Sequence, residues 1–285
     1  MQFQVIESLS LPGDPSKPNE DSFSHAAGFA CVFDGATVLG ENLMPGRSDA
    51  QWIAQFGARR LRAHAESNSG SPRDMLRSAV ADAEKSFKAL RKRAPVEVYE
   101  TPFSSLMGLF IRGERLEALW FGDCAALIKS PAGAVSVVGE TLKVRARERD
   151  RASTLGQSDG MAAASVREKF LPALRASRNR VNRKCGDWLF SPDAKCAAHA
   201  AEAKLVVEPG SHILLASDGF FALVSDYARY SADELMSAAL ERGLDALGKE
   251  LRAIEAGDPK GVSFPRFKSS DDATALLLSL TARND

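Results

Sequence analysis

Two spacings of apolar residues predict the elements of this chain. Short apolar runs bounded by glycine, proline and polar residues indicate strands, and they cover residues 2–9, 29–33, 106–111, 116–121, 125–128, 135–138, 204–207, 212–216 and 275–280. The runs between 104 and 138 predict one antiparallel meander. The runs on either side of Pro209-Gly210 predict a hairpin.

Apolar residues recur at helical spacing in four other stretches. Two of these helices are expected to begin at the capping signals Ser48-Asp49 and Ser71-Pro72. Their charged residues fall on the opposite face, which is typical of helices that cover one side of a sheet. A third helix is expected around 166–174, and a single long one over 235–254.

The apolar run Phe29–Phe33 stops abruptly at Asp34, and Gly35 follows. A buried carboxylate without a partner is costly, so Asp34 needs a cation, hydrogen-bond donors or water. Asp-Gly is also the commonest hairpin-turn dipeptide, and this stretch alone favours a plain turn.

Acidic residues stand at the start or end of an apolar strand in four further places: Glu20-Asp21, Asp123, Asp218-Gly219 and Asp271-Asp272. Together with Asp34 they make five such places. Such repetition in a chain with only 4 histidines predicts a carboxylate cluster at one edge of a sheet. Oxygen ligands favour hard cations such as Mg²⁺ or Mn²⁺ over zinc. Two such ions clamp an in-line phosphoryl displacement and lower the pKa of water, so the pattern indicates phosphoryl chemistry.

Composition and charge limit the classes of binding partner. Lys+Arg 37 balance Asp+Glu 37 among 285 residues, so no overall field favours nucleic acid or a membrane. The first residues show no basic stretch followed by an apolar one, and no apolar run approaches about 20 residues, so neither export nor a membrane span is expected. We therefore expect a cytoplasmic protein whose cysteines, Cys31, Cys124, Cys185 and Cys196, are reduced.

Residues 140–200 carry two basic stretches, 143–151 and 175–184, on either side of the third helix. Few aromatic residues accompany them, which argues against a platform for single-stranded nucleic acid. We expect a surface insertion that either meets an acidic or phosphorylated partner or is a plain solvated helix pair.

The acidic residues belong to five motifs: Asn19-Glu20-Asp21-Ser22, Val32-Phe33-Asp34-Gly35, Phe121-Gly122-Asp123, Leu215-Ala216-Ser217-Asp218-Gly219-Phe220 and Asp271-Asp272-Ala273-Thr274. Their order and approximate spacing resemble those of the metal-dependent protein phosphatases (PPM, type 2C). The resemblance extends from residue 19 to 280. The resemblance implies a single domain over 1–285 of the α+β class. It would be a four-layer αββα sandwich, with two antiparallel sheets flanked by helix pairs and the metals at one end. Residues 140–200 would form the family's variable flap.

The resemblance also implies a ligand set for two ions, Mn²⁺ or Mg²⁺. Asp34 resembles the bridging carboxylate, and the Gly35 carbonyl resembles a ligand of the first ion. Asp218 and Asp271 resemble the remaining ligands of the second ion. A water that bridges both ions would be the nucleophile.

The other acidic residues resemble supporting groups. Glu20 and Asp21 would hold metal-bound waters. Asp123 resembles a residue that helps bind a third, weaker ion in many bacterial members. Ala222 stands where a residue often completes that third site, so this departure puts the third ion in question. Asp272 stands where the family usually has asparagine.

Two departures from the family concern the substrate. Many members have an arginine shortly before the Glu-Asp pair to grip the phosphate, whereas this chain offers Lys17, which cannot form the planar two-bond clamp. Ala36 stands where some members have a histidine proposed to protonate the leaving group. General acid catalysis typically accelerates a reaction by about 10²–10⁴-fold, so the missing histidine is expected to slow the hydrolysis of esters with poor leaving groups.

The sequence thus predicts a metal-dependent phosphomonoester hydrolase, most simply one that removes phosphate from serine and threonine in signalling proteins. Two alternatives stay open. The first is a phosphatase of small phosphorylated metabolites, which the missing arginine and histidine favour. The second is a catalytically weak regulatory module that keeps the fold and binds without turnover.

Overall fold

The computed structural model describes residues 1–67, 70–140, 163–264, 266 and 268–283. These residues form two antiparallel five-stranded sheets. Sheet A has the order β1 (Gln2–Leu11), β10 (Ala273–Thr281), β9 (His212–Ala216), β6 (Ala125–Lys129) and β7 (Val135–Val138). Sheet B has the order β2 (Asp21–Ala26), β3 (Phe29–Gly35), β4 (Ser104–Arg112), β5 (Arg115–Phe121) and β8 (Ala201–Val206).

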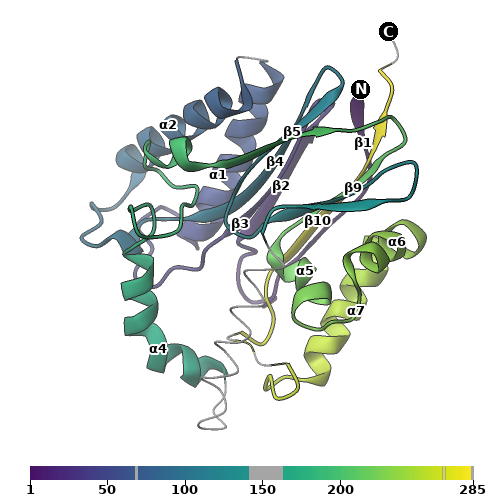
Figure 1. The fold of residues 1–285 in the computed structure, drawn as a ribbon. Helices are drawn as coiled ribbons and strands as arrows, with labels where there is room; N and C mark the ends of the chain where they lie inside the picture. The colour runs from purple at the N-terminus through teal and green to yellow at the C-terminus, as the bar shows by residue number, and fades with distance from the viewer. Residues whose placement is uncertain (68–69, 141–162, 265, 267, 284–285) are drawn as a thin grey trace.

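Helices flank both sheets (Figure 1). On the side of sheet B lie α1 (Asp49–Glu66) and α2 (Pro72–Leu90), which begin at the predicted caps Ser48 and Ser71. On the side of sheet A lie α5 (Asp218–Ser225), α6 (Ala232–Arg242) and α7 (Leu244–Gly257). The remaining helices are α4 (Ala163–Arg178) and the short 3₁₀ turns η1 (Val98–Glu100) and η2 (Cys196–His199).

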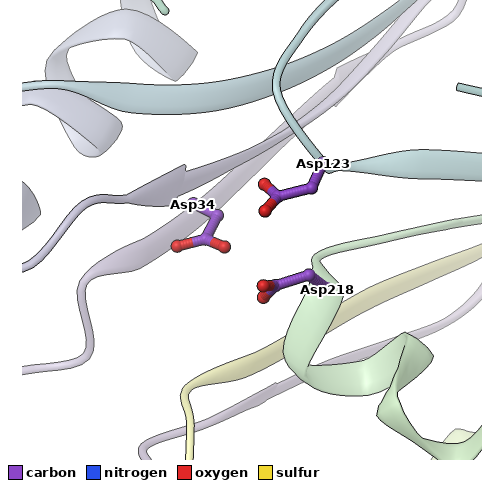
Figure 2. A group of neighbouring side chains, drawn as sticks. All are labelled: Asp34, Asp123 and Asp218. Atoms are coloured by element: carbon purple, nitrogen blue, oxygen red, sulfur yellow. The ribbon is translucent and has the colours of Figure 1, made fainter. Parts of the chain in front are cut away.

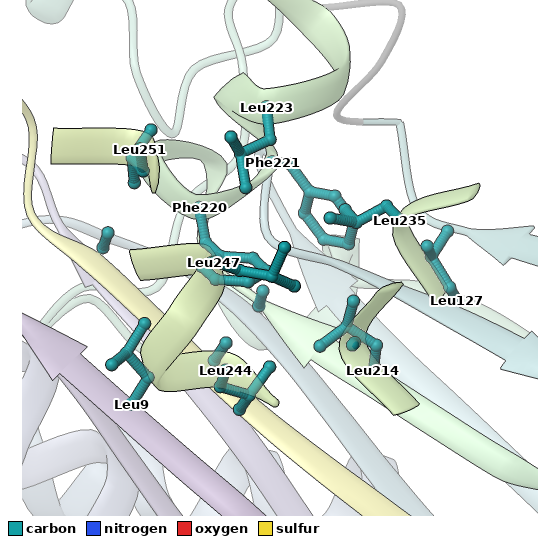
Figure 3. Packing of buried hydrophobic residues seen from close by; sticks show 14 of the residues in the cluster. Leu9, Leu127, Leu214, Phe220, Phe221, Leu223, Leu235, Leu244, Leu247 and Leu251 are labelled. Atoms are coloured by element: carbon teal, nitrogen blue, oxygen red, sulfur yellow. The ribbon is translucent and has the colours of Figure 1, made fainter. Parts of the chain in front are cut away.

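Three apolar clusters separate four layers. Strand β3 shows how, because its side chains alternate. Phe29 and Phe33 pack with α1 and α2, whereas Ala30 and Val32 join the cluster between the sheets. A third cluster fills the space between sheet A and its helices, where Phe220 of α5 lies near residues of α7 (Figure 3). The predicted α+β sandwich is therefore confirmed.

Two predicted strand pairings are wrong. The meander is interrupted after β5, because Gly122-Asp123-Cys124 carries the chain from sheet B into sheet A, where β6 pairs with β7 and β9. Likewise β8 pairs with β5 in sheet B, while β9 lies in sheet A, so the two do not form a hairpin. The physical reason is that the apolar strands of a sandwich are buried on both faces. A hydrophobic pattern therefore predicts where the strands are but not which strands pair with each other.

The predicted long helix over 235–254 is two helices. Gly243 adopts a φ of +81°, which ends α6 and turns the chain into α7. The carboxylate of Glu7 accepts hydrogen bonds from the amides of Leu244 (2.7 Å) and Asp245 (2.9 Å), so it caps the second helix. The helix predicted around 166–174 is confirmed as α4, whereas the basic stretch 143–151 lies outside the described residues.

Two further features concern the cysteines and the helices. All four cysteines are free, and Cys31, Cys124 and Cys196 are buried. Within the part of the chain that the structure describes, no helix combines the length and apolar character that a membrane span requires.

Candidate metal centre

Asp34 lies at the end of β3, on the face that looks toward sheet A. The alternation along β3 places it there, because it follows Val32 by two positions. It stands opposite Asp21 of β2 and Ser105 of β4. The Ser104 hydroxyl donates to the Asp34 carbonyl over 2.8 Å, which fixes the backbone at the strand end. Three strands of sheet B therefore position this carboxylate.

Asp123 and Asp218 come from two main-chain turns. Gly122 has a φ of +66°, and a Cβ there would come within 2.4 Å of the Ser105 hydroxyl, so glycine is required. The same hydroxyl donates to the Asp123 carboxylate over 2.6 Å. Asp218 is the first residue of α5 and directly follows the cap Ser217 at the end of β9.

These turns bring three carboxylates together. One ligand atom each of Asp34, Asp123 and Asp218 lies within 4.8 Å of the other two. Figure 2 shows the three side chains directed toward a common space, from the end of sheet B, from the link between the sheets and from the start of α5. Three carboxylate oxygens at this spacing can coordinate a hard divalent cation.

The cluster carries excess negative charge. Burial raises the pKa of Asp34 well above its usual range, and the charges of Asp218 and Asp21 raise it further. Burial also raises the pKa of Asp21, although a 2.7 Å hydrogen bond from the Ser217 hydroxyl opposes this. The second carboxylate oxygen of Asp21 is buried and has no hydrogen-bond partner among the described residues. Such an arrangement needs positive charge, so the residues fit a divalent cation.

Glu20 and Gly35 lock the neighbouring backbone. The two carboxylate oxygens of Glu20 accept from Thr37 Oγ1 (2.6 Å) and Ser48 Oγ (2.5 Å). The Gly35 amide donates to the Glu20 carbonyl over 3.1 Å. A Cβ at Gly35 would lie 2.5 Å from the carbonyl oxygens of both Glu20 and Ala50, so no larger residue fits. The start of α1 is thereby tied to the edge of sheet B.

Asp271 and Asp272 have different surroundings from the three clustered carboxylates. In the described residues Asp271 does not share the 4.8 Å spacing with all three, and its carboxylate lies 2.7 Å from Lys268 Nζ. Asp272 accepts from the amides of Gly13 (2.7 Å) and Glu20 (2.6 Å). Asp272 therefore holds both ends of the single loop between β1 and β2.

Lys268 brings a positive charge to the centre. Its side chain is 42% exposed, and its ammonium forms the ion pair with Asp271. Desolvation lowers the pKa of Lys268, but the carboxylates of Asp271, Asp34 and Asp218 outweigh this and raise it overall. Lys268 is therefore fully charged at neutral pH.

The predicted phosphate contact, Lys17, lies on an exposed loop. Its ammonium is 3.3 Å from the carboxylate of Asp14, and its side chain is 72% exposed. Arg47, from the loop between β3 and α1, donates to the Ser16 carbonyl over 2.9 Å. Two cationic side chains therefore meet at this loop, where the sequence indicated one.

The sequence did not indicate the groups that orient the predicted acids: Ser105, Ser217, Thr37, Ser48 and Lys268. Single hydroxyl residues have no spacing pattern that marks them as partners. Two of them had a local signal, because Ser48 was predicted as a helix cap and Ser217 immediately precedes Asp218. The others depend on which strands and loops become neighbours.

The sequence from residue 15 to 253 matches the family described as protein phosphatase 2C. The chain belongs to this family. The match covers most of its length and confirms the resemblance inferred from the ordered acidic motifs. A search of curated proteins finds no match.

Solved structures of phosphatases share this protein phosphatase 2C fold. The serine/threonine phosphatase PstP/Ppp of Mycobacterium tuberculosis is 14% identical, with a TM-score of 0.59 over 99% of this chain and 100% of that one. The PstP catalytic domain in complex with 2 manganese ions is also 14% identical, with a TM-score of 0.55 and 99% of each chain covered. PppA of Pseudomonas aeruginosa is 18% identical, with a TM-score of 0.54 and 98% of each chain covered.

Proposed function

We propose that this member of the protein phosphatase 2C family hydrolyses phosphoserine and phosphothreonine esters of proteins with two Mn²⁺ or Mg²⁺ ions. The observation that supports it best is the convergence of Asp34, Asp123 and Asp218 within 4.8 Å. The structure of the PstP catalytic domain with 2 manganese ions gives further support for divalent metals. Because all four cysteines are free, the cytoplasm is the proposed location.

In this proposal four groups hold the metals. Asp34 would serve both ions, the Gly35 carbonyl would serve the first, and Asp218 with Asp271 would serve the second. Asp123 would serve a third, weaker site, and its place beside Asp34 and Asp218 supports a role in the centre. When bound, divalent ions supply charge that polarises a phosphoryl group and lowers the pKa of water.

Glu20 and Asp21 orient water in this proposal. Asp21 has a buried carboxylate oxygen without a partner among the described residues, so that oxygen can accept from a water molecule. Glu20 would orient a water molecule through its fixed carboxylate, which Thr37 and Ser48 hold in one orientation. Such fixed acceptors restrict the direction from which a water reaches the phosphorus atom.

Lys17 contacts the substrate phosphate in this proposal. Its ion pair with Asp14 is exposed to solvent and therefore weak, so a phosphate dianion can replace the carboxylate. Ala36 offers no proton for the leaving group. Esters with good leaving groups, such as aryl esters, should therefore react fastest. Small phosphoesters form the second candidate substrate class, because they need fewer contacts with the protein around the phosphate.

The test is hydrolysis of p-nitrophenyl phosphate with and without Mn²⁺, together with Asp218→Asn. This ester needs little protonation of its leaving group, so it reports on the metal centre independently of Ala36. Metal-dependent turnover that Asp218→Asn abolishes is the expected result. Absence of turnover while electron paramagnetic resonance shows bound Mn²⁺ would overturn the proposal and favour a binding module.

A panel of phosphopeptides and small phosphoesters then decides the substrate class. A higher kcat/KM on phosphoserine and phosphothreonine peptides is expected. A higher kcat/KM on the small esters would favour the second candidate.

A further inference from the structure

A hollow of about 150 Å³ lies beside the C-terminal end of α2. We call it the α2–η1 hollow, because residues of α2 and η1 line it together with residues 181–183 and 191–193. Three cationic side chains line it, Lys88, Arg91 and Arg183, with a single acid, Asp193. Sites for drug-sized ligands are usually about 300–1,000 Å³, so this space suits one side chain.

Neighbouring acids balance only part of the positive charge in the hollow. Lys88 forms an ion pair with Glu84 over 2.5 Å. Arg91 lies over the ring of Phe87 at 5.4 Å, and Arg183 is exposed. Neither arginine has a carboxylate partner among the described residues. Two guanidinium groups of this kind form strong paired hydrogen bonds with a carboxylate that enters from outside.

The segment that carries Arg183 is held firmly. Asn182 is buried and adopts a φ of +56°, which asparagine tolerates better than most residues. Its side chain donates to Ser191 Oγ over 2.7 Å and accepts from the Leu189 amide over 2.8 Å. The backbone before Arg183 is therefore fixed in advance, which lowers the entropy cost of binding.

Short contacts connect the hollow to the metal centre. Ser104 Oγ donates to the Asp34 carbonyl, and the amides and carbonyls of Ser104 and Phe190 pair with each other at 2.9 and 3.0 Å. Phe103 and Ser191, the residues next to this pair, line the hollow. The hollow and the metal centre therefore share one end of sheet B.

We propose that the α2–η1 hollow binds an acidic side chain of the phosphorylated protein substrate, near the residue that is dephosphorylated. The inference rests on the proposed function, and it assigns a chemical preference to the substrate. It also gives a role to part of the second basic stretch, because Arg183 contributes to the hollow. The choice of a carboxylate follows from the excess of cations and the small volume.

The first test measures binding without turnover. A fluorescently labelled hexaglutamate peptide is titrated into the full chain, and anisotropy gives its Kd. Arg91→Gln and Arg183→Gln are each expected to weaken binding about 3- to 10-fold, because a partly exposed charge-assisted contact is lost. Arg115→Gln, at the opposite end of β5, removes the same charge and should leave the Kd unchanged.

The second test uses two phosphoserine peptides that differ only in having glutamate or glutamine near the phosphoserine. The acidic peptide is expected to have a lower KM, and Arg183→Gln should remove this advantage without changing kcat. Hydrolysis of p-nitrophenyl phosphate by the same variant should equal that of the unmodified protein. A merely structural role of Arg183 would change that control as well.

The outcomes separate the two proposals. If p-nitrophenyl phosphate is hydrolysed but hexaglutamate binds equally to the Arg183→Gln and Arg115→Gln variants, the docking inference is wrong and the phosphatase stands. If hexaglutamate binding depends on Arg91 and Arg183 but no ester is hydrolysed, the acidic-segment site stands and the phosphatase is wrong. Binding only to a phosphorylated peptide without glutamate would also overturn the inference.

Discussion

The carboxylates of the metal centre and those of Glu100 and Glu250 face opposite electrostatic surroundings. Glu100 is buried and receives both Nη groups of Arg93 (2.7 and 3.1 Å), which lower its pKa to about 2. Burial raises the pKa of Glu250, but hydrogen bonds from Arg229, Tyr230 and Arg242 outweigh it and leave a value of about 2. These acids hold loops and helices together.

At the metal centre the nearest charges are other carboxylates. Burial and the surrounding acids raise the pKa of both Asp34 and Asp21 well above the usual range. Arginines therefore contact Glu100 and Glu250, whereas other carboxylates surround Asp34 and Asp21. The comparison teaches that the sign of the neighbouring charges, more than burial itself, distinguishes a site for an added cation from a structural ion pair.

The largest effect is expected for Asp34→Asn. Loss of one carboxylate should lower hydrolysis of p-nitrophenyl phosphate by about 10³-fold, since metal charge contributes several kcal/mol to such reactions. In EDTA the variant should melt at the same or a higher temperature, because repulsion within the cluster is reduced. Steady-state kinetics and thermal unfolding check both parts. A large fall in the metal-free Tm would show that Asp34 is a structural residue.

Glu100→Gln should show the converse behaviour. It removes the charge that pairs with Arg93 and should lower the free energy of unfolding by about 2 kcal/mol. Turnover at saturating Mn²⁺ should not change. Urea unfolding and p-nitrophenyl phosphate kinetics on one preparation give the two values. Reduced turnover of a fully folded variant would contradict the distinction between the two regions.

The pH dependence of stability should follow Glu100 and Glu250. Both have folded-state pKa values of about 2, below the ordinary value of 4.5. Their stabilisation is therefore complete above about pH 5 and is lost as the pH falls toward 2. We expect a loss of about 1–2 kcal/mol per residue over this range, after allowance for partly exposed partners. Urea midpoints between pH 6 and 3 should fall less for Glu100→Gln than for the unmodified chain.

The smallest effect is expected for Lys268→Met. Lys268 forms an ion pair with the Asp271 carboxylate, so its removal takes a competing positive charge away from the centre and should strengthen Mn²⁺ binding about 2- to 5-fold. Calorimetric titration with Mn²⁺ measures this directly. Lys260→Met removes the same charge from an exposed position and should leave the affinity unchanged. Weaker Mn²⁺ binding would instead show that Lys268 orients Asp271 for the metal.

Local patterns in the sequence were sufficient for several features. Ser48 and Ser71 marked the starts of α1 and α2, because capping uses residues next to one another in the chain. Strand ends at Asp34 and Asp218 were visible for the same reason. Pairing was different: β5 and β6 are neighbours in sequence but belong to different sheets. The spacing of hydrophobic residues does not determine which strands pair in a sheet.

The sequence by itself determined the acidic motifs, the strand and helix periods and, through them, the family. Only the tertiary structure decided that Asp123 joins Asp34 and Asp218 while Asp271 pairs with Lys268. It also decided that Arg91 and Arg183, 92 positions apart, line one hollow. The physical reason is that charges interact through distance in space, which is set by the packing of two sheets and their helices.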